Sequence, residues 1–184
     1  MYLQCVPKLY LFSHGNCYSL GNDGVWSQGP SLKVPRYGAP SVSWGNGDRI
    51  LIMGGVKAKP VNGTWTETTS IEEVDFSRQT SKEIGNLPVN IYYACATNQN
   101  GKIHVIGGIQ DDGWASRRTW ISKVENFDWS QGPDLIDRRR WLACAYVPKW
   151  NITLVTGGQG SFFAEILTNN QFIRGRIKRD NQVS

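Results

Sequence analysis

Short apolar runs end in a glycine pair at three places along the chain. Residues 50–53 precede Gly54 and Gly55, residues 103–106 precede Gly107 and Gly108, and residues 153–156 precede Gly157 and Gly158. Runs this short predict strands, and a glycine pair allows the backbone to turn sharply where a strand ends. The first glycines lie at 54, 107 and 157. A spacing of about 50 residues predicts an internal repeat.

Other segments keep the same period. Small residues precede each run, at 38–42, 94–97 and 143–146, and an acidic-aromatic stretch at 71–75 returns at 124–128. The segment Trp-Ser-Gln-Gly-Pro begins at Trp26 and again at Trp129. We therefore predict four repeats of short strands, at 1–34, 35–88, 89–137 and 138–184. The first is degenerate, with His14 in place of the first glycine, and the last is degenerate toward its basic C-terminal tail.

This order of strands resembles the Kelch motif over most of the chain. The resemblance implies an all-β fold, a Kelch-type β-propeller or partial propeller of about four four-stranded antiparallel blades. It also implies that the rings of Trp26 and Trp129 pack on the glycine pairs, whereas Ser81 takes the tryptophan position in the second repeat. Family propellers usually close with more than four blades. We therefore expect a fragment of a longer propeller, or self-association through unclosed blade faces.

Composition is that of a globular protein, with 40% hydrophobic residues, 20 Gly and 8 Trp. The net charge of +5 is concentrated at 138–140 and in the C-terminal tail, without a nucleic-acid-binding motif. No apolar stretch reaches membrane-spanning length. We expect no nucleic-acid partner and no membrane partner.

The four cysteines, Cys5, Cys17, Cys95 and Cys144, form no CxxC pair, and only two histidines accompany them. We therefore predict no metal site and no cofactor. Cys95 and Cys144 fall at matching repeat positions, and we expect buried free thiols and a cytoplasmic protein. Two glycosylation triplets begin at Asn62 and Asn151. Because such triplets arise by chance and the second runs into a predicted strand, we do not expect glycosylation.

No catalytic residue is predicted. His104 alternates with core residues in a predicted strand, which favours a histidine satisfied within the fold, and adjacent acids such as Asp111 and Asp112 point apart on a strand or lie in a loop. Two alternatives stay open: a Kelch-like propeller enzyme of the sialate epimerase or oxidase type, and a truncated propeller fragment without independent function.

The resemblance implies a binding site on the loops at one rim, where an arginine just before the first strand of a blade grips an acidic peptide. Here these positions match Arg36 and Arg140, with Arg138 beside the latter. Neighbouring or loop aromatics complete the predicted partner-binding set, namely Tyr37, Trp65, Tyr92, Trp114 and Trp141. Tyrosine, tryptophan and arginine dominate binding hot spots. We predict a protein-binding module for acidic segments, with the substrate-recognition part of a ubiquitin ligase adaptor as one option. The alternative is that the arginines are structural pins and the loop tryptophans cover their own blades.

Overall fold

The computed structural model describes residues 10–13, 15–45, 47–59, 62–160, 163–168 and 170–175. Predictions that concern His14, Cys5 and the basic tail beyond residue 175 lie outside the described residues. The described part is all-β: it contains 17 strands, one short 3-10 helix, η1 (Pro148–Trp150), and no α-helix. The all-β prediction is therefore confirmed.

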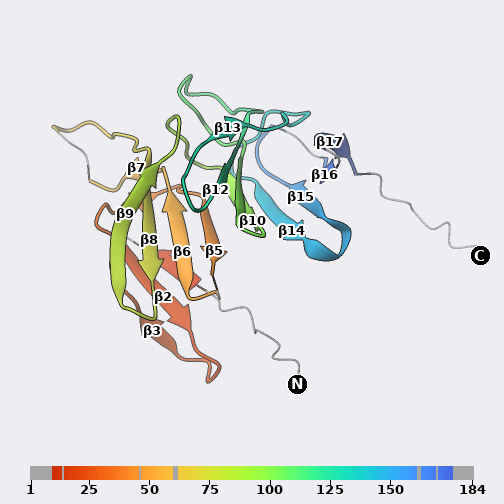
Figure 1. The fold of residues 1–184 in the computed structure, drawn as a ribbon. Helices are drawn as coiled ribbons and strands as arrows, with labels where there is room; N and C mark the ends of the chain where they lie inside the picture. Colours follow the sequence, from red (N-terminus) through yellow and green to blue (C-terminus); the bar gives the residue numbers. More distant parts are fainter. Residues whose placement is uncertain are drawn as a thin grey trace, which may run out of the picture.

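The strands form four main antiparallel sheets, which stand side by side in sequence order (Figure 1). Sheet 1 contains β1 (Tyr10–Ser13), β2 (Asn16–Leu20) and β3 (Trp26–Gln28). Sheet 2 contains β5 (Ser41–Trp44), β6 (Arg49–Met53), β8 (Ser70–Asp75) and β9 (Thr80–Asn86). Sheet 3 contains β10 (Cys95–Gln99), β11 (Lys102–Ile106), β12 (Thr119–Lys123) and β13 (Ser130–Gln131). Sheet 4 contains β14 (Ala143–Val147), β15 (Ile152–Thr156), β16 (Glu165–Thr168) and β17 (Gln171–Arg174). A small ladder joins β4 (Arg36–Tyr37) to β7 (Val56–Lys57).

Each glycine pair follows the second strand of its sheet, after β6, β11 and β15. All six glycines have positive φ, between 60° and 91°. The backbone N–H of Gly55 donates to Ile91 O at 2.8 Å, and Gly108 makes the same bond to Arg139 O at 2.8 Å. A Cβ atom built on Gly54 would lie 2.5 Å from Ile91 O, so a side chain there would push the next sheet away. The glycine pairs therefore join neighbouring sheets through backbone contacts.

The two repeated tryptophans do not pack on these glycines, which corrects the expectation drawn from the resemblance. The atoms nearest to a Cβ built on Gly54 or Gly107 are backbone carbonyls and leucine side chains. Trp129 stacks on Phe127 at 6.4 Å, and its Nε1–H donates to Asn86 O of sheet 2 at 2.9 Å. Trp26 is 44% exposed. Trp129 thus contacts the preceding sheet, whereas Trp26 lies in the first sheet of the described part of the chain.

Three apolar cores lie between successive sheets. The core between sheets 1 and 2 includes Cys17, Leu32 and Ile52; the core between sheets 2 and 3 includes Leu51, Ile71 and Val105; the core between sheets 3 and 4 includes Ile106, Leu142 and Val155. Sheets 2 and 3 have an apolar neighbour on both faces, and their second strands, β6 and β11, are accordingly short and mostly apolar, with four of five residues buried in each.

The other face of sheet 4 carries a row of apolar side chains. Ala145, Leu154, Ile166 and Ile173 lie opposite one another in register across its four strands. Their neighbours Cys144, Val155, Leu167 and Phe172 point to the core with sheet 3, and strand residues alternate between faces. Ile173 is 41% exposed. Self-association through such a face stays a prediction.

Candidate binding surface

The segments that lead into the first strands lie beside the loops that follow the glycine pairs. Tyr37 pairs with Val56, Tyr92 bridges to Ile109, and Arg140 bridges to Gln159. First and second strands are antiparallel, so the start of one meets the end of the other. We call this edge the rim, and it comprises residues 35–40, 90–94 and 138–142 with the loops after the glycine pairs. The loops of sheets 2 and 3 extend from this edge at the top of Figure 1.

Arg36 does not reach the surface of the rim, which corrects its assignment as a partner-binding residue. Its side chain and that of Glu72 are both 0% exposed and form an ion pair at 3.2 Å. Its guanidinium also donates to Gly54 O at 3.1 Å and to Ser70 O at 2.7 Å. A guanidinium enclosed in this way cannot bind a partner. Arg36 instead holds its leading segment to its own sheet.

The counterpart of Arg36 in sheet 4 is Arg139, one residue earlier than the sequence comparison suggested. Arg139 is 0% exposed and pairs with Glu165 at 2.8 Å. It also donates to Gly157 O at 3.1 Å and to Phe163 O. These acceptors repeat the set around Arg36, because Gly157 matches Gly54 as the first glycine of a pair. We call Arg36–Glu72 and Arg139–Glu165 the arginine locks.

Sheet 3 replaces the arginine lock with neutral side chains. Ile91 stands where the other two sheets have the arginine, and it is fully buried. Gln110 donates through Nε2–H to Gly107 O and Arg118 O, both at 3.3 Å, and accepts from the Nε1–H of Trp120 at 3.3 Å. Trp120 pairs with Val105 as Glu72 pairs with Ile52, so it occupies the glutamate position. Gln110 and Trp120 form the neutral lock.

The chain before each lock explains this exchange. Leu32, Leu87 and Leu135 are equivalent, because their backbone N–H groups donate to Gly15 O, Thr69 O and Arg117 O. The next residue donates its N–H to the lock carboxylate in two cases: Lys33 to Glu72 at 2.5 Å, and Ile136 to Glu165 at 2.7 Å. In the third case that residue is Pro88, which has no N–H to donate. Sheet 3 thus lacks one of the two backbone N–H donors that each lock carboxylate accepts in sheets 2 and 4.

Three equivalent residues form a line of backbone hydrogen bonds along the rim. Tyr93 N–H donates to Gly38 O at 2.7 Å, and Trp141 N–H donates to Tyr93 O at 2.8 Å. Their φ angles are +66° for Gly38, +55° for Tyr93 and +57° for Trp141. Glycine adopts this left-handed region readily, whereas a bulky residue there is strained by roughly 1–3 kcal/mol. Two large aromatic residues thus occupy a position where the backbone favours glycine.

Aromatic rings, some half-buried and some exposed, continue from these positions. Tyr93 contacts Tyr92 and Trp141, each with ring centroids 5.3 Å apart, and Trp141 is 55% exposed. At the sheet 2 end, Tyr37 packs edge-on against Trp65, which is 54% exposed. We call these five residues, with Arg140, the aromatic ridge. Burial, Glu67 and Tyr93 raise the pKa of Tyr92, while Arg140 opposes the shift. Tyr92 is therefore neutral at physiological pH.

Arg140 is the ridge cation. Its guanidinium lies over the Trp141 ring, 4.6 Å from the centroid, and its Nε–H donates to Gln159 Oε1 at 2.7 Å. The structure shows no ion pair for Arg140 within the part of the chain that it describes. Two contacts thus hold the guanidinium in place without neutralising its charge.

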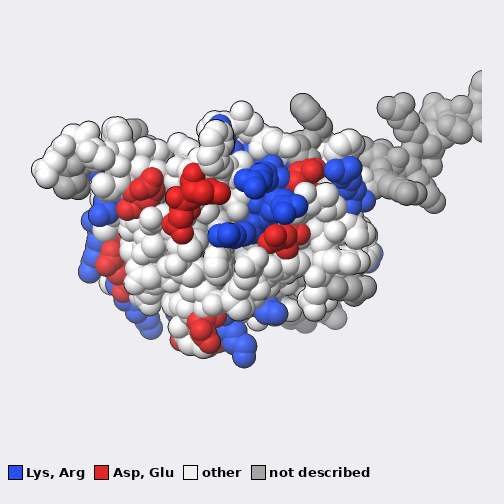
Figure 2. Space-filling model, turned by 90° about the horizontal axis from the view of Figure 1, so that it is seen from above, with Lys and Arg blue, Asp and Glu red and all other residues white. Residues whose placement is uncertain are grey.

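The remaining predicted residues lie beside the ridge. Trp114 is 72% exposed in the loop after Gly108. Arg138 lines a depression of about 350 Å³ with Arg117 and Arg118. The same depression contains three acidic residues, Asp111, Asp112 and Asp134. Figure 2 shows basic and acidic side chains side by side on this face. A site for acidic segments is expected to be positively charged, but in this part of the rim the three basic and three acidic side chains balance.

A second depression, of about 620 Å³, lies at the sheet 2 end of the ridge, and its lining includes Phe12, Leu32, Tyr37, Gly38 and Trp65. It lies where sheets 1 and 2 meet and is open beside the Tyr37–Trp65 pair.

No family model matches the chain. A search of curated proteins also found no match. No helix in the described part of the chain is long and apolar enough to cross a membrane.

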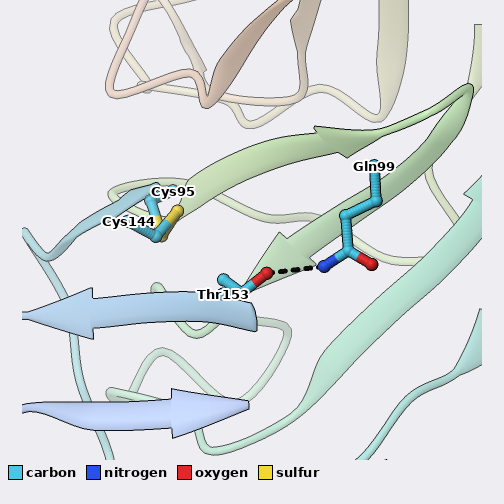
Figure 3. The surroundings of a disulfide bond; sticks show 4 residues. All are labelled: Cys95, Gln99, Cys144 and Thr153. Carbon is cyan, nitrogen blue, oxygen red and sulfur yellow. Dashed lines mark hydrogen bonds between the residues drawn. A yellow bond between two sulfur atoms is a disulfide. The ribbon is translucent and has the colours of Figure 1, made fainter. Parts of the chain in front are cut away.

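Two cysteines form a disulfide, which corrects the expectation of buried free thiols. Cys95 on β10 and Cys144 on β14 have Cα atoms 5.9 Å apart and link the first strands of sheets 3 and 4 (Figure 3). The backbone register matches Cys95 with Ala143, because Cys95 pairs with Ile106 and Ala143 with Thr156, and both partners directly precede a glycine pair. Cys144 is thus offset by one residue. Since side chains alternate along a strand, this offset turns the two cysteines toward each other.

Two further titratable groups in the described interior, Cys17 and His104, are held in their neutral forms by burial. Burial, with a smaller effect of Glu72, raises the pKa of the Cys17 thiol to about 12, so the thiol is inert. His104 is 5% exposed, and its Nε2 has no hydrogen-bond partner among the described residues. This corrects the expectation of a satisfied strand histidine. Burial, with a smaller effect of Lys102, lowers its pKa to about 4. Within the described residues, no group of three or more His, Cys, Asp and Glu could hold a metal ion.

Sequence reasoning found most of the ridge but missed Tyr93, Gln110 and Arg139. The signal for Tyr93 is its alignment with Gly38 and Trp141. To see it, one must align the sheets by the residue pairing between first and second strands. Any of the three arginines in the run Arg138-Arg139-Arg140 could be aligned with Arg36. Only the length of the hairpin between the first and second strands identifies Arg139 as the buried one.

Proposed function

We propose that the chain is a protein-binding module of the Kelch-type β-propeller class, and that its aromatic ridge binds an extended acidic segment of a partner protein. The observation that carries this proposal is that two large aromatic residues, Tyr93 and Trp141, stand where the backbone favours glycine, and that Trp141 is 55% exposed. Strained residues of this kind concentrate at functional sites, where the side chain has a use that offsets the strain.

The chemistry of the ridge supports a peptide ligand. Tyrosine and tryptophan provide large rigid contact surfaces, and arginine makes forked, charge-assisted hydrogen bonds to carboxylates. Arg140 is held by Trp141 and Gln159 before any partner binds, which reduces the entropy lost on binding. The depression beside Trp65 offers a place for an apolar side chain at the other end.

The propeller assignment is supported by the repeated geometry of sheets 2, 3 and 4. Their first strands, β5, β10 and β14, lie next to one another, and their glycine pairs make equivalent bonds to the following sheet where a further sheet follows. The Cys95–Cys144 disulfide favours an oxidising compartment, in which structural disulfides persist. The proposal therefore leaves out a role in a cytoplasmic ubiquitin ligase.

Selection from a random peptide library tests the function. We expect the wild-type chain to enrich segments with Asp or Glu beside an apolar residue. Arg140→Ala should then weaken binding of a selected peptide about 10- to 100-fold, the range for a lost hydrogen bond to a charged group. Arg140→Lys should recover only part, and binding should weaken as salt rises.

The matched control is Arg78→Ala, because Arg78 is an exposed arginine in the turn between β8 and β9, away from the rim. This variant should bind as wild type does. Selection without acidic enrichment, or equal losses for Arg78→Ala and Arg140→Ala, would contradict the proposal.

A further inference from the structure

Two Asn-X-Thr triplets occur in the chain, and the structure places them in opposite environments. Asn62-Gly63-Thr64 lies in the loop between β7 and β8, and Asn151-Ile152-Thr153 leads into β15. The triplet is the acceptor pattern for N-linked glycosylation, which requires an accessible asparagine in a chain that enters the secretory compartment.

The first triplet is fully presented to solvent. Asn62, Gly63 and Thr64 are all exposed, and a Cβ atom built on Gly63 would meet nothing within 4 Å. The structure records no hydrogen bond to the side chains of Asn62 or Thr64 within the described residues. The next residue, Trp65, is also exposed, at 54%. This triplet therefore has the space and the exposed side chains that an oligosaccharide needs.

The second triplet is tied into the fold. Asn151 Oδ1 accepts a hydrogen bond from Tyr146 O–H at 2.9 Å, and Asn151 closes the turn between β14 and β15. Thr153 is 0% exposed, and its Oγ1 accepts a hydrogen bond from Gln99 at 2.5 Å (Figure 3). A hydroxyl enclosed between sheets 3 and 4 is not available to a modifying enzyme once this hairpin has formed.

The disulfide supplies the independent observation on compartment. Cys95 and Cys144 are joined across two sheets, and such bonds form and persist mainly in oxidising compartments, which for a eukaryotic chain are those of the secretory pathway. Glycosylation of asparagine takes place in the same compartment. The disulfide thus gives weight to a triplet that the sequence alone could not separate from chance.

We propose that Asn62 is an N-glycosylation site. In the transfer, Asn62 Nδ2 attacks the anomeric carbon of an oligosaccharide carried on a lipid diphosphate. A C–N bond forms at Nδ2, the bond from the anomeric carbon to the phosphate oxygen breaks, and the lipid diphosphate leaves as Nδ2 gives up one proton. No oxidant or reductant takes part. This site is independent of the proposed peptide-binding function.

The position of Asn62 also predicts where a glycan would lie. It would flank the Tyr37–Trp65 end of the aromatic ridge, because Asn62 is three residues before Trp65 in the same loop. The Arg140–Trp141 end belongs to sheet 4, and it would stay accessible to a partner.

The test expresses the chain behind a cleavable signal peptide in mammalian cells and analyses both the secreted and the retained protein by peptide mass spectrometry. Release of the glycan by an amidase in heavy-oxygen water converts a modified asparagine to a labelled aspartate. We expect the label at Asn62 in most molecules, little or none at Asn151, and a Cys95–Cys144 crosslinked peptide before reduction.

Thr64→Ala is the matched variant, because it destroys the acceptor triplet but keeps Asn62 and changes only an exposed side chain. It should abolish the label and leave both the crosslink and peptide binding intact. Unmodified Asn62 in the wild-type chain would overturn the proposal, whether or not the crosslink forms. A label at Asn151 with none at Asn62 would overturn it as well. Peptide binding is measured separately, so its failure would count against the ridge alone.

Discussion

In sheets 2 and 4, a buried arginine from the leading segment pairs with a glutamate and donates to two backbone carbonyls of its sheet, whereas in sheet 3 the donor is Gln110, from the loop after the glycine pair, with Trp120 as its neighbour. The same pair of carbonyl acceptors is satisfied in all three sheets. What differs is the side chain that pairs with the donor: a glutamate in sheets 2 and 4, and Trp120 in sheet 3. The change occurs where Pro88 takes the place of a residue whose backbone N–H donates to the glutamate. In the two sheets that use an arginine, the glutamate also accepts two backbone N–H groups of the leading segment, while the two carbonyl acceptors are the same in all three sheets.

The largest effect should follow from breaking an arginine lock. Glu165→Ala leaves the buried Arg139 without its carboxylate and removes the acceptor of the Ile136 and Asp137 N–H groups. Breaking a buried ion pair on one side typically costs about 3–5 kcal/mol. Urea unfolding should show a loss of that size in the free energy of unfolding. A loss below about 1 kcal/mol would mean that the lock adds little.

Sheet 3 should make the fold less stable at acidic pH, because it alone of the three sheets has a histidine at this core position. His104 occupies the position of Leu51 in sheet 2 and Leu154 in sheet 4, three residues before each glycine pair. The pKa of His104 is about 4 when folded, against an ordinary 6.5. Between these pH values the unfolded chain binds more protons than the folded chain. The free energy of unfolding should therefore fall by up to about 3 kcal/mol as the pH drops from 6.5 to 4, and stay unaffected by this group above 6.5.

The variant His104→Leu isolates this contribution, since it installs the residue of the other two sheets. Its unfolding free energy should lose the histidine part of the pH dependence, while the carboxylates contribute as before. Identical pH profiles for His104→Leu and wild type would show that the histidine is not buried in neutral form.

A smaller effect should follow from breaking the neutral lock. Gln110→Ala leaves Gly107 O, Arg118 O and the Trp120 Nε1–H without their partner, and a lost buried hydrogen-bond partner costs about 1–3 kcal/mol. Measured beside Glu165→Ala in the same urea series, this variant should lose less. Equal losses would remove the distinction between the two kinds of lock.

The sequence predicted the elements of sheets 2, 3 and 4 because strand period and glycine pairs are local signals. It missed contacts that depend on register across sheets. The sequence repeat aligned Arg140 with Arg36, yet Arg139 is the buried arginine. A shift of one residue exchanges the buried and exposed sides of a strand. The sequence repeat placed Cys95 and Cys144 at equivalent positions of neighbouring sheets, where their side chains would point the same way and could not bond. The true register offsets them by one residue, which allows the disulfide. Trp26 and Trp129 are followed by the same four residues, Ser-Gln-Gly-Pro, but Trp129 donates to a carbonyl of the preceding sheet, whereas Trp26 lies in the first sheet that the structure describes.

The central claim is that Trp141 serves a partner and not the fold, and Trp141→Gly tests it most directly. Glycine is the natural residue at the equivalent position of sheet 2, Gly38, and accepts the positive φ without strain. The free energy of unfolding should therefore stay within about 1 kcal/mol of wild type, while calorimetric titration with a selected acidic peptide should show binding lost or weakened at least 10-fold. A strongly destabilised variant, or one that binds the peptide as wild type does, would contradict the account.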